Sequence, residues 1–206
     1  MEKTILIATS NEGKVREMEK AFDGLPVRLV PLSHLCDVLP DAGDIEEPVE
    51  DGATFMENAR IKAHYYRART GLAALADDSG LSVEALDGAP GVYSARYAGV
   101  HGDDAANNAK LIRDLRERGT ENAAAAYHCA LVLALEDGGE LAAEGTCTGF
   151  IRPEARGTEG FGYDPHFYRA DGRSMAELSR EEKHAISHRG AALEMMKKLL
   201  LERGVV

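Results

Sequence analysis

The segment TILIATSNEGKVREMEKAF, residues 4–22, decides the fold class of this chain. Its first part, TILIA at 4–8, is a short apolar run that predicts a buried strand. Val15, Met18 and Phe22 then recur at the i, i+3 and i+7 spacing of one helix face. The polar sequence TSNEGK lies at the junction between them. A strand, a polar turn and a helix in this order are typical of an α/β protein.

Capping signals and apolar periodicity predict further helices. Thr54 and Glu57 have the capping-box spacing, which indicates a helix over 54–68. Another helix is expected over 103–118, and its predicted inward-facing residues are Ala109, Leu111, Ile112 and Leu115. A final helix closes the chain before Gly204, with Leu193, Met196, Leu199 and Leu200 on one face.

The remaining segments predict strands and loops. Residues 127–135 and 140–150 are β-like and are separated by DGG, which favours a hairpin. ADDSGL at 76–81 predicts a turn that leads into a strand, and the Gly- and Ala-rich residues 88–101 predict a loop. We therefore expect one α/β domain over 1–206, with a mixed central β-sheet flanked by helices and a bilobed form.

Composition limits the classes of partner. The chain has 206 residues and a net charge of −11, which argues against broad binding to nucleic acid, whose phosphates it would repel. The apolar run at the N-terminus is too short for a secretory signal, and no segment is as apolar as a membrane span. We therefore expect a cytoplasmic protein without membrane partners. The three cysteines are too scattered for a disulfide framework, so they should be reduced structural residues (Cys36, Cys129 and Cys147).

Two adjacent acids, Asp77 and Asp78, lie between apolar segments. Their burial would be costly unless a cation or hydrogen bonds compensate their charge, and a divalent metal is a partner that also does chemistry. The alternative is a solvated turn, because Asp-Asp-Ser-Gly is typical of loops.

TSNEGK has the features of an anion site. Free N–H groups at a helix start bind phosphate, and Thr9, Ser10 and Asn11 add side-chain donors. Lys14 falls in the first helical turn, where the helix dipole disfavours a cation that has only a structural role. The spacing is not that of a P-loop. Plain capping by Ser10 or Asn11 is the alternative interpretation.

Two later segments could bind a ligand, one a nucleobase and the other an anionic group. In FGYDP, residues 161–165, Phe161 or Tyr163 could stack on a base; a turn with the aromatic rings in the core is the alternative. Lys183 should lie near the start of a short helix, and His188-Arg189 should precede the final helix. Cations at helix starts suggest an anionic ligand, although a solvated charged face would give the same pattern.

Five blocks together resemble the inosine triphosphate pyrophosphatase-like (Ham1) family of non-canonical purine nucleoside triphosphate pyrophosphatases. The blocks span nearly the whole chain in the family's order, and they are TSNEGKVREM (9–18), EDGATFMENARIKA (50–63), ADDSGLSVEALDGAPGVYSARYAG (76–99), GFGYDPHF (160–167) and ELSREEKHAISHRGAAL (177–193). One departure is Ser10, where many members have glycine; its hydroxyl can itself donate a hydrogen bond.

The resemblance implies Mg²⁺-dependent hydrolysis of ITP, dITP and XTP to the monophosphate and pyrophosphate, by a homodimer with its site in the cleft between two lobes. It implies that the triphosphate is held by Thr9, Ser10, Asn11, Gly13 and Lys14. Glu50 and Asp78 would serve the metal, and Asp78 would be the catalytic base, with Asp77 as the alternative. Ser79 would touch the substrate, and the nucleotide pocket would be formed by Phe161, Gly162, Tyr163, Asp164, Lys183, His188 and Arg189.

The implied selectivity has a physical basis. Hypoxanthine and xanthine carry a keto oxygen at C6 that could accept a hydrogen bond from a donor such as Arg189. Adenine presents an amino group there and would leave that donor unpaired, a loss of about 1–3 kcal/mol.

Two other functions fit parts of the sequence. A Maf-like pyrophosphatase would act on pyrimidine or modified nucleotides, but the SHRG and FGYDP blocks count against it. A non-catalytic nucleotide sensor would keep TSNEGK and the basic residues, yet it would not need both Glu50 and Asp78.

Overall fold

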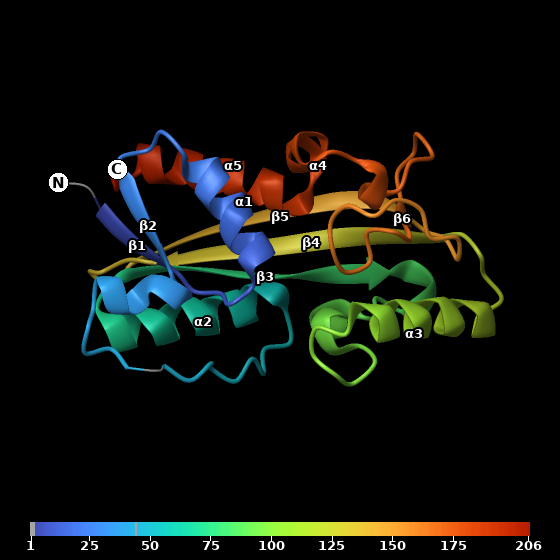
Figure 1. Ribbon diagram of the computed structural model, residues 1–206, viewed down its shortest axis with the longest axis horizontal. Coiled ribbons are helices and arrows are strands. Elements are labelled where there is room, and N and C mark those ends of the chain that lie inside the picture. Colours follow the sequence, from blue (N-terminus) through green and yellow to red (C-terminus); the bar gives the residue numbers. More distant parts are fainter. Residues whose placement is uncertain (1–2, 44) are drawn as a thin grey trace. The chain divides into compact units, whose positions relative to one another are not determined.

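The computed structural model describes residues 3–43 and 45–206 and contains a six-stranded sheet in the order β2-β1-β3-β4-β5-β6 (Figure 1). The strands are β1 (Lys3–Ile7), β2 (Val27–Pro31), β3 (Ala73–Val83), β4 (Ala123–Ala134), β5 (Glu140–Ile151) and β6 (Phe167–Tyr168). β1 pairs in parallel with both β2 and β3, whereas β6 is antiparallel to β5. The predicted mixed sheet is therefore confirmed.

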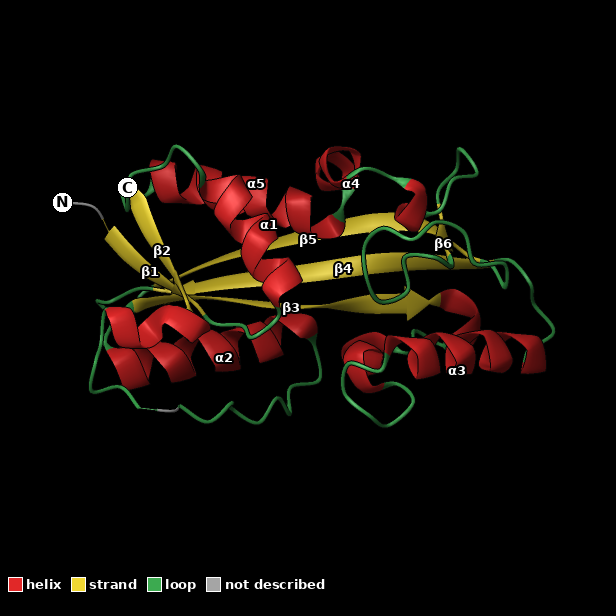
Figure 2. Cartoon of the chain, in the orientation of Figure 1, coloured by secondary structure: helices red, strands yellow, loops and turns green. Residues whose placement is uncertain are grey.

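Five α-helices accompany the sheet in the described part of the chain (Figure 2). They are α1 (Glu12–Phe22), α2 (Phe55–Thr70), α3 (Asp104–Glu117), α4 (Arg180–Ile186) and α5 (His188–Glu202). None of the described helices is long and apolar enough to cross a membrane.

The chain divides into two compact units, each assembled from separate segments. The first unit contains Met1–Asp78, Cys129–Glu144 and Gly190–Val206. The second unit contains Ser79–His128 and Gly145–Arg189. The predicted cleft between lobes stays a prediction.

Helices cover both faces of the sheet in the first unit. Ile5 and Ile7 of β1 pack into one core with residues of α1 and α5, whereas Leu6 packs into a second core with residues of α2. This alternation follows from the two-residue period of a strand. Figure 1 shows α1 and α5 on one side of these strands and α2 on the other. Burial on both faces explains why TILIA is a continuous apolar run.

The core of the second unit contains residues of α3 together with residues of β3, β4, β5 and β6. Leu111, Ile112 and Leu115 of α3 are buried there, as predicted. Ala109 was wrongly predicted to face inward and is exposed, because the buried stripe of the helix runs through Asn107 instead. The side chain of Asn107 binds the backbone of Ala98, which satisfies a buried polar group that periodicity of apolar residues does not reveal.

The predicted turn at ADDSGL is wrong, because the whole segment lies within β3. The turn preference of Asp, Ser and Gly is local, and the strand is stabilised by ion pairs to distant lysines that are described below. The loop expected at 88–101 contains a short 3-10 helix, Gly91–Arg96. His188 and Arg189 were expected before the final helix and are instead its first two residues.

Candidate active site

Asp77 and Asp78 point to opposite faces of β3, because successive strand residues alternate. Asp77 follows the period of Ala73 and Leu75, which pack in the core that contains α1 residues. Asp78 follows the period of Ala74 and Ala76, which pack in the core that contains α2 residues. Each acid meets a lysine from the helix on its own side, Lys14 from α1 and Lys62 from α2. Adjacent carboxylates therefore have separate surroundings.

Asp77 is fully buried and its charge is compensated internally. Its Oδ1 forms an ion pair with Nζ of Lys14. Its Oδ2 accepts a hydrogen bond from Sγ of Cys129 at 3.0 Å. The three cysteines are free, and the buried Cys129 thus has the structural role expected for it. Both carboxylate oxygens of Asp77 are engaged, which favours a structural role for this acid over a catalytic one.

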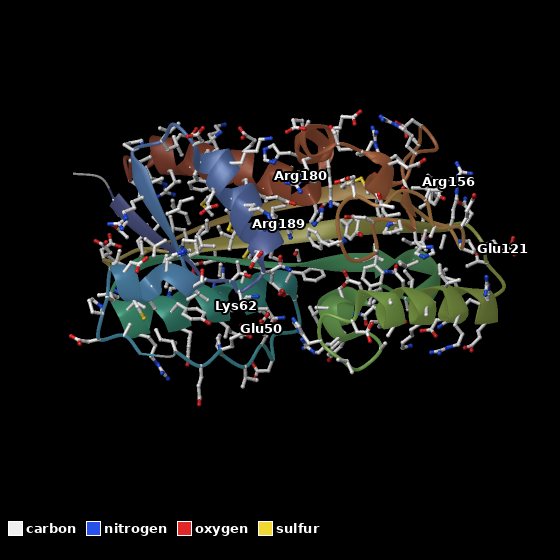
Figure 3. The ribbon with its side chains drawn as sticks, viewed as in Figure 1. Glu50, Lys62, Glu121, Arg156, Arg180 and Arg189 are labelled. Atoms are coloured by element: carbon white, nitrogen blue, oxygen red, sulfur yellow. The ribbon has the colours of Figure 1, made fainter. Side chains whose placement is uncertain are left out.

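Asp78 shares the ammonium group of Lys62 with Glu50. Lys62 Nζ lies 2.8 Å from Glu50 Oε2 and 3.6 Å from Asp78 Oδ1. Figure 3 shows the side chains of Glu50 and Lys62 beside each other. Burial opposes the charge of Lys62, but the attraction of Asp78 and Glu50 raises its pKa above the usual 10.5. The position between these two acids is therefore one that favours a cation.

The carboxyl group of Asp78 differs from an exposed carboxyl group in its pKa and in its hydrogen bonding. Burial raises its pKa above the ordinary 3.8, although Lys62, Lys14 and a hydrogen bond from Asn58 act in the opposite direction. Its Oδ2 is buried and has no hydrogen-bond partner among the described residues. A buried acceptor without a partner is uncommon in folded proteins and suggests a ligand or an ion. A raised carboxyl pKa beside a specific charge partner is also typical of functional sites.

The residues around Asp78 fit a magnesium ion that also binds substrate. No cluster of three or more His, Cys, Asp or Glu side chains in the described chain is arranged to hold a metal by itself. Mg²⁺ is commonly held by one or two carboxylates and by phosphate oxygens of its substrate. Glu50 and the unpartnered Oδ2 of Asp78 would supply that number of carboxylates.

TSNEGK joins β1 to α1. Because Ile7 at the end of β1 pairs with Leu75, this junction begins near the β3 residues that precede Asp77. Asn11 is the N-cap, and its side chain accepts from the backbone N–H of Lys14, so the predicted capping is confirmed. Thr9 accepts from the N–H of Asn11 at 3.2 Å. The N–H groups of Glu12 and Gly13 have no recorded hydrogen bond within the described residues. These two amides at a helix start are suited to bind a phosphate.

Ser10 and Lys14 are less available than their sequence context suggests. Ser10 Oγ donates to Glu47 at 2.9 Å, so this hydroxyl already has an acceptor. Lys14 was interpreted as a cation that the helix dipole disfavours, but its ion pair with Asp77 compensates that cost. Its side chain is nevertheless 15% exposed, so Lys14 is not fully enclosed.

In the second unit, Asp164 organises the FGYDP segment. Its carboxylate forms an ion pair with Lys183 and accepts from the N–H of Phe161 at 2.9 Å. Lys183 follows the capping box of Ser179 in α4, as predicted. The Phe161 ring is exposed and lies 4.7 Å from Lys183 Nζ. Tyr163 is buried and its hydroxyl donates to Ser94 O at 2.7 Å, so Phe161 is the ring available for stacking.

His188 and Arg189 are buried rather than solvated. The His188 ring stacks on Tyr127, with centroids 4.8 Å apart and an angle of 14° between planes. Arg189, labelled in Figure 3, donates from Nη2 to Ser79 Oγ at 2.9 Å. Its Cζ lies 5.8 Å from the Phe161 ring. The charged-surface interpretation of these two residues is therefore wrong, since a buried guanidinium needs specific acceptors.

The predicted site residues fall into two groups. The first unit holds Thr9, Ser10, Asn11, Gly13, Lys14, Glu50 and Asp78, whereas the second unit holds Ser79, Phe161, Gly162, Tyr163, Asp164, Lys183, His188 and Arg189. Sequence reasoning missed Lys62 and Asn58. Lys62 lies at a helical interval from Phe55 and Ala59. A lysine on the apolar face of a predicted helix is the signal by which Lys62 could have been identified from the sequence.

Fold and site define an α/β protein in which lysines pair with carboxylates next to the carboxyl end of β1, where its parallel pairing with β3 ends. The carboxyl ends of parallel strands are where such sheets commonly bind ligands. A model of the Ham1 family matches residues 5–199. A dITP/XTP pyrophosphatase of Geobacter sulfurreducens is 47% identical over 98% of both chains. One from Syntrophobacter fumaroxidans is 51% identical over 94% of this chain and 80% of its own.

Solved structures give the same result. The structure of a HAM1 protein from Coxiella burnetii has a TM-score of 0.85 and 41% identity, and covers 97% of this chain and 99% of its own. A nucleoside-triphosphatase (dITP/XTP pyrophosphatase) from Mycobacterium abscessus has a TM-score of 0.73 and 43% identity, covering 94% and 97%. The chain belongs to the Ham1 family.

Proposed function

We propose that this chain hydrolyses the non-canonical purine nucleotides ITP, dITP and XTP to the monophosphate and pyrophosphate, and so removes them from the nucleotide pool. The observation that carries the proposal is the carboxyl group of Asp78, with its buried, unpartnered Oδ2 and raised pKa beside Lys62 and Glu50. Relatives of nearly equal length bear the name dITP/XTP pyrophosphatase.

Asp78 accepts a proton from the water that attacks the α-phosphorus, and pyrophosphate leaves with the electrons of the broken P–O bond. A carboxylate with a raised pKa is a stronger base than an ordinary one, which suits this step. Glu50 and Asp78 would hold Mg²⁺, which when bound would supply positive charge that neutralises phosphate charge. Lys14 and Lys62 add positive charge, and the amides of Glu12 and Gly13 bind a phosphate oxygen.

The second unit recognises the base. Phe161 stacks on the purine, and its ring lies near the cations of Lys183 and Arg189. Arg189 donates to the keto oxygen at C6, and His188 is held by its stacking on Tyr127. We also propose that the protein is a cytoplasmic homodimer.

The test is pyrophosphate release from a panel of nucleotides, with and without Mg²⁺, using Asp78→Asn as the matched inactive control. We expect rapid release from ITP, dITP and XTP, slow release from ATP, and no release without the metal. Preference for a pyrimidine triphosphate would favour a Maf-like enzyme. Binding of ITP without any hydrolysis would favour a sensor and contradict the proposal.

A further inference from the structure

Helix α3 contacts the backbone of the FGYDP segment through two side chains. Asp104 Oδ2 accepts from the N–H of Gly162 at 2.7 Å. Asn108 Nδ2 donates to the carbonyl oxygen of Gly162 at 2.8 Å. Both backbone polar groups of one residue are therefore held by the same helix. Gly162 has a φ of +62°, a conformation that disfavours other residues, and the two bonds fix it there.

The orientation of the Asn108 amide is determined by its partners. Nδ2 donates a second hydrogen bond, to the carbonyl oxygen of Asp104 at 2.8 Å. Because both partners are carbonyl oxygens, the NH₂ group must face them. Oδ1 of Asn108 is then buried without a hydrogen-bond partner among the described residues. The two bonds that Nδ2 donates, and not a bond to Oδ1, therefore hold this amide in place.

Gly162 follows Phe161, the exposed ring of the segment. The N–H of Phe161 is already held by Asp164, so α3 fixes the other side of this residue. An aromatic ring fixed in its binding position before the ligand arrives loses less conformational entropy when a base stacks on it. Holding Gly162 is therefore a way to strengthen stacking on Phe161.

We propose that Asp104 and Asn108 are positioning residues that hold Gly162, and through it the Phe161 ring, ready for stacking on the base. The inference rests on the proposed function for the identity of the ligand. The pair, which we call the α3 clamp, acts through the backbone of Gly162.

Fluorescence tests the clamp without any nucleotide. The chain contains no tryptophan, so Phe161→Trp introduces a single reporter at the ring position. We expect Asn108→Ala in that background to increase the fast local motion seen by time-resolved anisotropy. Arg113→Ala is the matched control, since Arg113 lies on the same helix in surface ion pairs with Asp114 and Glu117. Unchanged anisotropy in Asn108→Ala overturns the clamp.

The two products separate base binding from phosphate binding. With otherwise native sequence, Asn108→Ala should raise the KM for ITP and the inhibition constant of IMP by about tenfold, because a mobile ring loses part of its stacking on the base. Inhibition by pyrophosphate, which has no base, should stay unchanged. Equal weakening of IMP and pyrophosphate indicates a general structural defect and overturns the proposal.

Asp104 supplies an independent pair of variants on the helix surface. Asp104→Asn keeps an acceptor oxygen for Gly162 and should behave like the native chain, whereas Asp104→Ala should reproduce the effects of Asn108→Ala. The two Asp104 variants also test the α3 clamp if Asn108→Ala fails to fold. Identical behaviour of Asp104→Asn and Asp104→Ala overturns the clamp. Increased ring motion together with absent ITP hydrolysis in the native chain contradicts the proposed function and leaves the physical clamp supported.

Discussion

Asp78 differs from Asp77 in how its charge is compensated. Asp77 has an ammonium group on one oxygen and a thiol on the other. Asp78 has one oxygen near Lys62 and a second, buried oxygen without a hydrogen-bond partner in the described chain. The two-residue period of β3 produces this difference by sending the acids to opposite faces. This difference supports our proposal that Asp78, rather than Asp77, is the base and would hold the metal.

We expect Asp78→Asn to fold and to bind ITP but to lose about 10²–10⁴-fold in turnover, because an amide cannot accept the proton of the attacking water. Steady-state rates at saturating Mg²⁺ and ITP binding by calorimetry measure the two properties. Asp77→Asn is the comparison variant. Near-normal kcat in Asp78→Asn, with loss in Asp77→Asn, would reassign the base to Asp77.

Lys14 has two roles to separate, because it compensates the buried Asp77 and is predicted to bind phosphate. Removing it alone leaves Asp77 without this ammonium group, and breaking a buried ion pair costs about 3–5 kcal/mol of stability. We expect the double variant Lys14→Met/Asp77→Asn to regain much of that stability. It should still bind ITP about tenfold to a hundredfold more weakly, since a charge-assisted bond is lost.

Thermal unfolding and calorimetry with ITP and IMP measure these effects on the single and double variants. The monophosphate has fewer phosphate groups for Lys14 to contact, so IMP binding should weaken much less than ITP binding. Equal losses for ITP and IMP would show that Lys14 does not contact the phosphate chain.

At the scale of elements, the predictions that held rest on local signals. The capping boxes at Thr54 and Ser179 start α2 and α4, and apolar periodicity placed α1, α3 and α5. ADDSGL could not be assigned in the same way. The partners of its acids, Lys14 and Lys62, lie far away in sequence, and local preference for a turn carries no information about them.

The motifs supply the candidate site residues, and their roles stay predictions. The burial of Tyr163 and His188 follows from tertiary packing, which apolar spacing within FGYDP or SHRG does not encode. The contribution of Lys62 was missed for the same reason, since its two acid partners lie in other segments of the chain.

Glu140 at the start of β5 links the hairpin to α2 and gives the stability a pH dependence. It accepts hydrogen bonds from Arg60 at 2.8 Å and has His64 Nε2 at 2.8 Å. Mainly through these bonds to Arg60 and His64, its pKa is lowered below 4.5. A carboxyl group whose pKa is lower in the folded state stabilises the fold when the pH is above its pKa in the unfolded state. This stabilisation disappears as the pH falls through its pKa in the folded state.

We therefore expect Glu140→Gln to lower the free energy of unfolding at pH 7 by about 0.5–1 kcal/mol, a small value because the pair is partly exposed. The difference from the native chain should shrink as the pH falls below 4.5 and vanish once the pH is below the lowered pKa of Glu140 in the folded state. Urea unfolding across this range measures it, with Glu144→Gln as the control from the same strand. A difference that persists unchanged at low pH would show that the carboxylate charge is not responsible.

At the scale of the molecule, each of the two units carries its own group of candidate site residues. The first unit holds the carboxylates, lysines and helix start that suit phosphate and metal, and the second holds the ring and the buried cations that suit a base. Because the net charge of the chain is −11, basic residues must be concentrated locally wherever an anionic substrate binds. Substitutions in the first unit should therefore change turnover or phosphate binding, whereas those in the second should change base binding or base preference.

Arg189 tests this division. Its guanidinium is buried and donates to Ser79, so it lies in surroundings where an unsatisfied donor is costly. If Arg189 donates to the keto oxygen at C6, Arg189→Ala removes both the attraction to ITP and the donor that rejects the amino group of ATP. The ratio of kcat/KM for ITP over ATP should narrow by about tenfold to a hundredfold.

Steady-state rates on both nucleotides measure the ratio, and Asp78→Asn is the control from the first unit, in which both rates should fall while their ratio stays unchanged. Arg189→Lys keeps a cation near Ser79 and should retain more of the preference than Arg189→Ala, although its single ammonium group cannot reproduce the planar donor pair of arginine. If the ratio stays constant in Arg189→Ala while both rates fall together, Arg189 contributes to phosphate binding or to structure. Base choice would then depend on His188 and Phe161.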